Sequence, residues 1–446
     1  MLNYVLQKYR NLVSDERFSE ILAGSAWALA ARLAATGMGL AASIIIARFY
    51  GADIVGIVAV IQSFLLLATI FTVLGTQTSI LRLIPEHLVK YSPTSAFKLY
   101  RKTQFMVVGV SLVTGTLFFV GADMIATRVF SKPHLSFYFA LASIFVVFKS
   151  LMLLNTQAVR GLRLIKVFAL MQVLPQGFNL LLLVSLGLLW SSRDVPIYAI
   201  LGGFAITGIL GWFIMEYAFR QKMHPDDPVH NMPVFKILSI SMPMLMTATM
   251  TFVIGHTGVI MLGMFRSEAE VGYYAIAVKL ATLTAFILSA VNSMAGPKFS
   301  ELFYSDKMDE LFYVAKKSAK LIFWTTAPVL LGFVVLGKPI LHIAFGQEFI
   351  VAYPALVLLV LGQFVHSISG ATGLFMNMTG NQNVFRNIVF AAAAANILLN
   401  LLLTPEHGIY GAATAGMASL VGWNIATLCY IKMKFGKTTG YFPGIA

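Results

Sequence analysis

The chain has 446 residues, of which 58% are hydrophobic and only 11% are charged, and its mean hydropathy is +0.82. Soluble globular domains carry about 25% charged residues, so this composition excludes an ordinary soluble protein and predicts an integral membrane protein. The net charge of +14 raises the question of nucleic-acid binding, and the single cysteine, Cys429, excludes both a disulfide within the chain and a thiolate metal cluster.

Long apolar runs recur along the whole chain, and each approaches or exceeds the ~20 residues that a membrane-spanning helix needs. They predict an all-α membrane protein with about twelve transmembrane helices joined by short connections. The short connections disfavour a membrane enzyme with a large catalytic loop. The predicted spans are, in chain order, residues 21–48, 54–81, 103–125, 135–157, 167–190, 196–219, 237–264, 270–296, 318–337, 351–378, 385–404 and 408–431.

The Lys and Arg residues are concentrated in alternate loops. An even number of spans places both termini on the same side, and the loops of that side, such as residues 82–102 and 298–320, are rich in Lys and Arg. The positive-inside rule therefore predicts that both termini are cytoplasmic. The same asymmetry accounts for the net charge, so nucleic acid is not an expected partner, whereas the lipids of the inner leaflet are.

Two corners of the sequence resemble each other. Residues 48–56 read RFYGADIVG and residues 264–272 read MFRSEAEVG; each follows an apolar run, carries an acidic residue shortly before a glycine and opens another apolar run. The repeat predicts two parallel six-helix halves, an arrangement typical of alternating-access transporters with a site between the halves. Between them, KMHPDDPVHNMP at 222–233 is read as a helix-breaking linker and not as a metal site. The expected organisation is a cytoplasmic N-terminal tail (1–20), an N-terminal half (21–221), a cytoplasmic linker (222–236), a C-terminal half (237–431) and a cytoplasmic C-terminal tail (432–446).

Several short segments stand in a fixed order and together resemble a known family. They are ARFYGADIVG at 47–56, RGL at 160–162, MLGMF at 261–265, EVGYYAIAVKL at 270–280, GPKFSEL at 296–302, FGQEF at 345–349 and GIYGAATAG at 408–416. The series is similar to the Wzx-type, O-antigen-type flippases of the multidrug/oligosaccharidyl-lipid/polysaccharide (MOP) exporter superfamily. One departure is Gly258, because many of these flippases carry an acidic residue at that place before MLG.

The resemblance implies a V-shaped bundle like that of the multidrug (MATE) exporters, in the bacterial cytoplasmic (inner) membrane. It further implies that the chain moves a polyprenyl-pyrophosphate-linked oligosaccharide between leaflets during surface polysaccharide synthesis, with other polysaccharide-assembly membrane proteins as further partners. A cation-coupled multidrug or small-molecule exporter of the same superfamily is the alternative. The sequence has no P-loop, HExxH or nucleophile-elbow pattern, so we expect no enzyme activity, no cofactor and no metal.

Three cations stand inside the predicted spans, namely Arg32, Lys149 and Lys279. A charge at such depth costs about 2.5–3.5 kcal/mol even on lenient scales, so these residues are expected to face protein or a water-filled cavity. Arg32 shares a polar helical stripe with Ser43, and Lys279 shares one with Thr282. Because no Asp or Glu lies well inside a span, a basic cavity is predicted, which suits a pyrophosphate. Snorkelling to the surface and structural pairing with a carbonyl or polar neighbour are the alternatives for each cation.

Further polar residues follow helical stripes in the last spans. They are either contacts to the glycan or interhelical hydrogen bonds that pack small-residue faces together. His256 is either a packing histidine or a group that couples transport to protons. The candidates for the glycan cavity are Gln363, His366, Asn377, Asn396 and Asn400.

Overall fold

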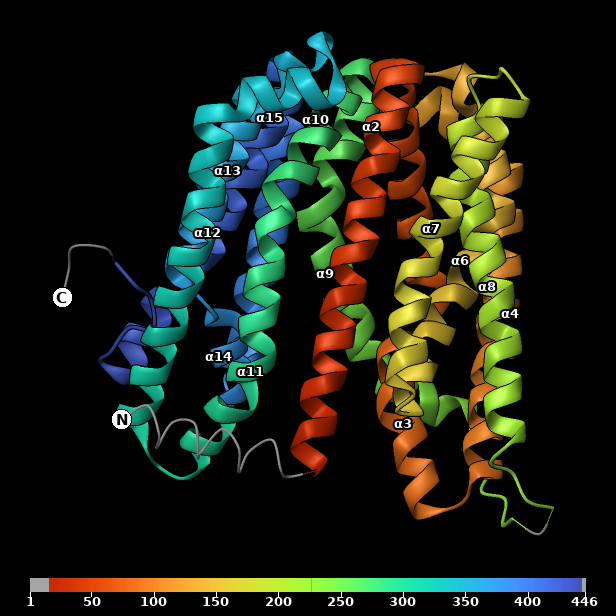
Figure 1. The fold of residues 1–446 in the computed structure, drawn as a ribbon, viewed down its shortest axis with the longest axis vertical. Helices are drawn as coiled ribbons and strands as arrows, with labels where there is room; N and C mark the ends of the chain where they lie inside the picture. The colour runs from red at the N-terminus through yellow and green to blue at the C-terminus, as the bar shows by residue number, and fades with distance from the viewer. Residues whose placement is uncertain (1–15, 226, 443–446) are drawn as a thin grey trace. The chain divides into compact units, whose positions relative to one another are not determined.

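In the computed structural model the chain is almost entirely helical (Figure 1), and its structure is described for residues 16–225 and 227–442. Most of the predicted N-terminal tail lies outside these residues. No strand occurs in the described part, which confirms the all-α prediction. The elements are α2 (Glu16–Val73), α3 (Thr76–Lys90), α4 (Pro93–Val120), α5 (Ala122–Met124), the π-helical turn η1 (Ile125–Val129), the 3-10 turn η2 (Pro133–Leu135), α6 (Ser136–Gly161), α7 (Ile165–Leu189), α8 (Val195–Arg220), α9 (Val234–Phe265), α10 (Glu268–Ala281), the 3-10 turn η3 (Thr282–Thr284), α11 (Ala285–Tyr304), α12 (Met308–Phe345), the 3-10 turn η4 (Gln347–Ala352), α13 (Tyr353–Ser369), α14 (Thr372–Met378) and α15 (Gln382–Phe435).

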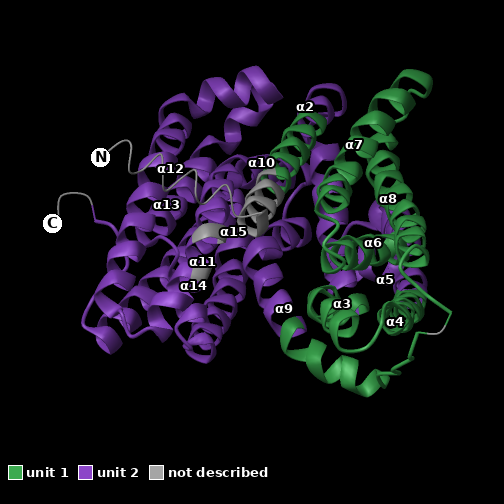
Figure 2. Ribbon diagram, turned by 60° about the horizontal axis from the view of Figure 1, so that its bottom comes forward, with its two compact units in different colours: residues 1–42, 72–114, 145–244 green, residues 43–71, 115–144, 245–446 purple. Residues whose placement is uncertain are grey.

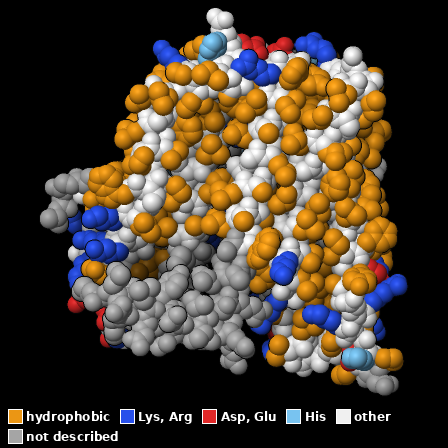
Figure 3. Space-filling model, in the orientation of Figure 1, with side chains coloured by type: hydrophobic (Ala, Val, Ile, Leu, Met, Phe, Trp, Pro, Cys, Tyr) orange, Lys and Arg blue, Asp and Glu red, His pale blue; other side chains and the backbone are white. Residues whose placement is uncertain are grey.

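Ten helical segments of the described residues are long and apolar enough to cross a membrane, as expected of a multi-pass membrane protein. Helices suit such runs because lipid offers no hydrogen-bond partner and a helix satisfies its backbone internally. On the face seen in Figure 3, hydrophobic side chains cover the middle of the helices, while Lys and Arg gather toward their ends.

Two of these helical segments are far longer than one membrane crossing. They span 47 residues in α2 and 54 in α15, which at 1.5 Å per residue is over twice the ~30 Å of a hydrocarbon core. Each contains one non-helical residue, Gly51 (φ 83°) in α2 and Gly408 (φ 53°) in α15, and glycine adopts positive φ without steric cost. Gly51 falls between the predicted spans 21–48 and 54–81, and Gly408 is the first residue of the predicted span 408–431, whereas the total of twelve spans stays a prediction.

The prediction of one continuous helix over residues 54–81 is wrong. Helix α2 ends at Val73, and the next two residues, Leu74 (φ 51°) and Gly75 (φ 75°), are left-handed. Helix α3 then begins as a separate segment. Its sequence, TQTSILRLIPEHLVK, is much more polar than the preceding run, so it does not continue the apolar span.

The predicted spans 351–378 and 270–296 are also interrupted. The first divides into α13 and α14 at Gly370, where φ is 70° and an added Cβ would lie 2.6 Å from the Cβ of Ala319 in α12. Only glycine permits both the backbone conformation and this close approach. The second divides into α10 and α11 at the turn η3.

The chain forms two compact units, coloured separately in Figure 2. Unit 1 comprises the described residues up to Ala42 with Thr72–Thr114 and Phe145–Met244. One core cluster of unit 1 surrounds Tyr100 and Phe219, which are fully buried with apolar side chains of α3 and α6.

Unit 2 comprises Ser43–Phe71, Gly115–Ile144 and the described residues from Leu245 onward. Its core cluster surrounds Phe299 and Phe375, whose rings pack edge to face. The unit boundaries do not coincide with the predicted linker at 222–236, so the division into two six-helix halves stays a prediction.

Candidate functional site

The two sequence repeats meet at a helix crossing within unit 2. A Cβ added to Gly56 in α2 would lie 1.8 Å from the carbonyl oxygen of Glu268 in α10, and one added to Gly272 would lie 2.2 Å from that of Ala52. The contact is reciprocal, because each glycine faces the carbonyl of the residue four positions before the other glycine. Glycine has no Cβ, and small residues of this kind let helix backbones approach closely. We call this contact the glycine crossing.

Charged side chains surround the start of α10 next to the glycine crossing. The ammonium of Lys132 lies 3.3 Å from the Glu268 carboxylate and donates to the carbonyl of Arg266 at 2.6 Å. The ring of His134 shares the same carboxylate through Nε2, at 2.9 Å from Oε1. Glu268 thus gathers two partners from the segment between α5 and α6.

A second ion pair, between Arg266 and Glu270, lies in the same unit next to Gly408. Arg266 pairs with Glu270 at 3.3 Å, and a Cβ on Gly408 would lie 2.4 Å from Glu270 Oε2. The guanidinium of Arg48 donates to the carbonyl oxygens of residues 342–344 at the end of α12. A cation at a helix C-terminus is favourable because the last carbonyls there carry partial negative charge.

The motif FGQEF at 345–349 joins this group. The ring of Phe349 packs edge to face against Tyr273 of the EVGYY motif, with ring centroids 5.3 Å apart. The structure therefore brings together, within unit 2, the segments ARFYGADIVG, EVGYY, FGQEF and GIYGAATAG, which are far apart in sequence.

Lys279 follows the glycine crossing along α10. It is half-buried and donates a hydrogen bond to the hydroxyl of Ser43 in α2. The two polar stripes predicted from the sequence, one with Ser43 and one with Lys279, thus meet at this bond. A hydroxyl is a neutral hydrogen-bond acceptor, so this contact orients the ammonium of Lys279.

The other two predicted cations belong to unit 1. Arg32 is exposed on α2, about three turns before Ser43. Lys149, in the middle of α6, is half-buried, and its ammonium lies 3.5 Å from the centroid of the Phe204 ring in α8. This cation–π contact is with an aromatic ring and not with the carbonyl or polar neighbour considered for this residue, so its role stays a prediction.

The polar stripe predicted along residues 363–377 is divided between two helices. Gln363 and His366 are half-buried in α13, while Asn377 is exposed in α14, beyond the break at Gly370. His366 Nδ1 lies 3.0 Å from the amide nitrogen of Asn424. The assumption that a single helix carries all these residues on one face is therefore wrong.

Asn396 and Asn400 are each 1% exposed and hydrogen-bonded within α15. Asn396 donates to the hydroxyl of Ser419 at 3.0 Å, across the bend at Gly408, and Asn400 donates to the Asn396 carbonyl at 2.9 Å. Buried amides that bond neighbouring segments are typical of helix packing in membranes. This geometry favours packing over glycan contact for both residues.

His256 and Gly258 lie two residues apart in α9 and contact different neighbours. His256 is half-buried, with Nδ1 3.2 Å from the Ser63 hydroxyl and its ring stacked on Phe252. A Cβ on Gly258 would lie 2.5 Å from the hydroxyl of Tyr274. The space next to Gly258 is thus filled by the tyrosine, which leaves no room for a carboxylate without a rearrangement.

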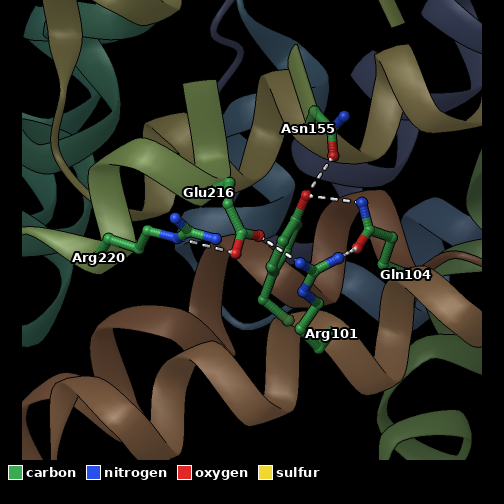
Figure 4. A network of polar contacts seen from close by, with 6 residues as sticks. Arg101, Gln104, Asn155, Glu216 and Arg220 are labelled. Atoms are coloured by element: carbon green, nitrogen blue, oxygen red, sulfur yellow. Dashed lines mark hydrogen bonds and ion pairs between the residues drawn. The ribbon is translucent and has the colours of Figure 1, made fainter. Parts of the chain in front are cut away.

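A polar network in unit 1 was not predicted from the sequence (Figure 4). The buried hydroxyl of Tyr100 donates to Asn155 Oδ1 at 2.8 Å and accepts from the Gln104 amide at 3.1 Å. Arg101 donates to Gln104 Oε1 at 3.0 Å and forms an ion pair with Glu216. The network connects α4, α6 and α8. In the sequence it could be recognised by Glu216, a lone acid near the end of one apolar run, and by Arg101, an arginine near the start of another.

Comparison with known proteins places these features in a family. A family model described as "polysaccharide biosynthesis protein" matches residues 45–354. The chain is 24% identical over 238 residues to the probable low-salt glycan biosynthesis flippase Agl15 of Haloferax volcanii, a match that covers 52% of this chain and 48% of that protein. It is 27% identical over 166 residues to the probable flippase AglR of the same organism, covering 36% and 34%. The chain thus spans about half the length of the first of these relatives.

Solved structures with the same fold cover nearly the whole chain. The lipid II flippase MurJ, in an inward closed conformation, superposes with a TM-score of 0.71 at 15% identity over 92% of this chain and 87% of MurJ. An inward-facing multidrug resistance MATE family transporter of the MOP superfamily gives 0.66 at 14% identity over 92% and 98%. These likenesses confirm the predicted MATE-like fold, and the match over residues 45–354 shows that the chain belongs to the polysaccharide biosynthesis protein family.

Proposed function

We propose that the chain is a flippase that moves a lipid-linked oligosaccharide across a membrane, without enzyme activity of its own. The family match, the names of the two Haloferax volcanii relatives and the MurJ-like fold support this proposal. The substrate is a polyprenyl-pyrophosphate oligosaccharide for surface polysaccharide synthesis. The membrane is the bacterial cytoplasmic membrane with both termini in the cytoplasm, and other polysaccharide-assembly membrane proteins supply and receive the lipid-linked sugar.

The observation that carries the substrate class is the distribution of charge along the apolar helices. Lys279 lies eleven residues, or about 16 Å of helix, beyond the start of α10, and Lys149 lies in the middle of α6. The acidic residues Glu216 and Glu268 stand within the terminal turns of their helices. Buried cations attract an anionic group such as a pyrophosphate, whereas export of cationic drugs calls for buried carboxylates.

Each cation has a defined role in this proposal. Lys279, oriented by Ser43, and the exposed guanidinium of Arg32 bind the pyrophosphate. Lys149 exchanges its contact with the Phe204 ring for a phosphate oxygen when substrate is present. The half-buried Gln363 and His366 and the exposed Asn377 contact the glycan, and His256 couples transport to protons.

Transport requires that access switch from one side to the other, and the glycine crossing is the contact that we propose to separate. Two backbones held together by van der Waals contact and by nearby ion pairs can part without breaking a helix. The crossing is directly followed along α10 by Lys279. Separation of α2 and α10 at the crossing would therefore move Lys279, the cation proposed to bind the substrate.

A multidrug or small-molecule exporter is the second candidate, because the fold is shared with a multidrug resistance transporter. The two candidate functions differ in the expected role of Lys279. A cationic drug would be repelled by this lysine, so its replacement by a neutral residue would improve drug export and not impair it.

The test is surface-glycan display in a strain that lacks the chromosomal copy and carries plasmid copies of the wild type, Lys279→Ala, Lys279→Arg or Lys279→Glu. We expect display to be lost on deletion, restored by the wild type, largely kept by Arg and abolished by Glu. Lys317→Ala, on an exposed face of α12, is the matched control, and membrane abundance is measured for every variant. Intact display in the deletion strain would contradict the proposal and direct attention to drug efflux.

A further inference from the structure

An open groove of about 660 Å³ lies in unit 1, between the start of α4 and the segment that leads into α9. Three cations line one part of it, Lys98, Arg101 and Lys102. The rest of its wall is mainly apolar and includes Phe105 and Val234. We call it the basic groove.

The cations of the basic groove differ in how their charge is compensated. Arg101 is paired with the Glu216 carboxylate. Lys102 donates to two neutral acceptors, Asn231 Oδ1 and the carbonyl of Met232. Lys98 is exposed and forms no hydrogen bond or ion pair with any residue that the structure describes.

Among the described residues, the acidic Asp227 contacts the start of α4. The Asp227 carboxylate accepts hydrogen bonds from the hydroxyl and the backbone amide of Thr94, one turn before Lys98. Together, Asp227 and Glu216 offset two positive charges. Arg220, which also contacts Glu216 at 3.4 Å, adds one, so these described side chains together carry a net positive charge.

The position of the groove along α4 corresponds to the level of lipid headgroups. Helix α4 has 28 residues, or about 42 Å, which exceeds the ~30 Å hydrocarbon core by about eight residues. Lys98 and Lys102 lie within the first ten residues of α4, and Phe105, 70% exposed, follows on the same face. This face of α4 therefore changes from cationic to apolar between Lys102 and Phe105, as a surface does that passes from headgroups to acyl chains.

The apolar wall of the groove continues on the other side. Val229 is 48% exposed and Val234 41% exposed. Apolar side chains at the edge of a cationic groove suit the first methylene groups of an acyl chain, and burying them is favourable by about 25 cal/mol per Å². A free phosphate ion would leave this apolar surface uncovered.

We infer that the basic groove is a binding site for an anionic phospholipid of the surrounding membrane, with its phosphate between Lys98 and Lys102 and its acyl chain along Phe105 and Val234. None of Arg32, Lys149 and Lys279 lines this groove, and the inference does not depend on what the chain transports. A bound lipid would link the start of α4 to the segment before α9. That segment already contacts α4 through Lys102, so the lipid would stabilise unit 1.

Native mass spectrometry of the purified full-length chain tests this inference. The chain, in detergent, is titrated with phosphatidylglycerol or phosphatidylcholine of identical acyl composition. The groove variant is the double substitution Lys98→Gln with Lys102→Gln. The matched control is the double substitution Lys166→Gln with Lys222→Gln, which changes two exposed lysines of unit 1 outside the groove. Thermal unfolding in phosphatidylcholine shows that each variant is folded, and Lys98→Gln alone, which removes no described contact, serves if the double variant is unstable.

We expect the wild type and the control to bind phosphatidylglycerol more tightly than phosphatidylcholine. The groove variant should lose this preference, with about tenfold weaker binding of phosphatidylglycerol. Glycerol 1-phosphate, a soluble headgroup, should not compete at equal concentration. Equal binding of phosphatidylglycerol by the groove variant and the control would overturn the inference, and so would full competition by the soluble headgroup, which would show an anion site that does not recognise lipid.

Discussion

The glycine crossing and the network around Arg101 are both close contacts between helices, but backbone atoms form the first and side chains form the second. In the crossing, backbone carbonyls lie against Gly56 and Gly272 with no side chain between. In the network, the side chains of Tyr100, Arg101 and Glu216 hold the helices through hydrogen bonds and an ion pair. The crossing therefore has no space for an added atom, whereas the network can lose its bonds one at a time. This difference predicts an abrupt response to substitution in the first and a graded response in the second.

The largest effect is expected at the glycine crossing. Gly56→Ala places a Cβ where the Glu268 carbonyl lies, 1.8 Å away, so α2 and α10 must move apart. Overpacking typically costs about 1–3 kcal/mol and occasionally more, and because the clash here is with backbone we expect the upper part of this range. Thermal unfolding of the purified protein should show a clear loss of stability, and surface-glycan display should fall with it.

Gly255→Ala is the control for the crossing, because a Cβ there would meet nothing within 4 Å. In a helix this change is neutral or stabilises by roughly 0.5–1 kcal/mol. If Gly56→Ala were as stable and as active as Gly255→Ala, the crossing would not be the close contact described here.

A smaller effect is expected when the ion pair of the network is broken. Arg101→Met leaves the Glu216 carboxylate with the more distant guanidinium of Arg220, at 3.4 Å. Loss of one partner of a fully buried pair costs 3–5 kcal/mol, and since the side chains of Arg101 and Glu216 are 26% and 20% exposed, about 2 kcal/mol is expected. Chemical denaturation of Arg101→Met and of Arg101→Met with Glu216→Gln measures it. The double variant should recover part of the loss, and no recovery would show that the pair is not what stabilises this region.

Removal of a single hydroxyl from the network should cost less. Tyr100→Phe deletes the donor to Asn155 Oδ1 and the acceptor for Gln104, in a fully buried position. We expect a loss of about 1–2 kcal/mol, measured by thermal unfolding against Tyr304→Phe, whose side chain is 77% exposed. Equal unfolding temperatures for the two variants would argue against the network as a stabilising element.

The smallest effect concerns pH and His87, which lies next to the core of unit 1. Burial is the main cause that lowers the pKa of His87 below its ordinary value of 6.5, and its Nδ1 lies 2.8 Å from the Leu83 carbonyl. Because the unfolded chain binds a proton more readily than the folded chain at this position, its contribution to stability is complete above pH 6.5 and decreases as the pH falls below that value.

Unfolding temperatures of the wild type, His87→Gln and the exposed control His224→Gln, measured from pH 7.5 to pH 5, test this expectation. The decrease with acidification should be shallower in His87→Gln than in the other two. Parallel curves for all three proteins would show that His87 does not contribute to the pH dependence.

Much of the fold follows from the sequence because lipid restricts what an apolar run can do. The apolar runs predict helices, and the corners at Gly51 and Gly408 fall where short polar or glycine-containing motifs interrupt those runs. The resemblance of the two corners also singles out Gly56 and Gly272, although it does not reveal that these residues touch.

The remaining features depend on neighbours that are distant in sequence. The break at Gly370 arises where Ala319 of another helix approaches it. Asn396 resembles a cavity residue on its own helix, but its amide is bonded to Ser419 across a bend. The partner of Arg101, Glu216, is 115 residues away. Periodicity identifies the polar face of a helix, and it does not identify what that face meets.

Reconstitution tests whether the chain moves a lipid-linked anion that Lys279 holds. Purified wild type, Lys279→Arg and Lys279→Ala are placed in vesicles that carry a fluorescent polyprenyl-pyrophosphate oligosaccharide, and accessibility of the label to a membrane-impermeant quencher is followed with time. We expect rapid exchange of the label between leaflets with the wild type, partial exchange with Lys279→Arg, and little more exchange with Lys279→Ala than in protein-free vesicles. Exchange by Lys279→Ala at the wild-type rate would contradict the role of the lysine, and no exchange by the folded wild type would contradict the flippase itself.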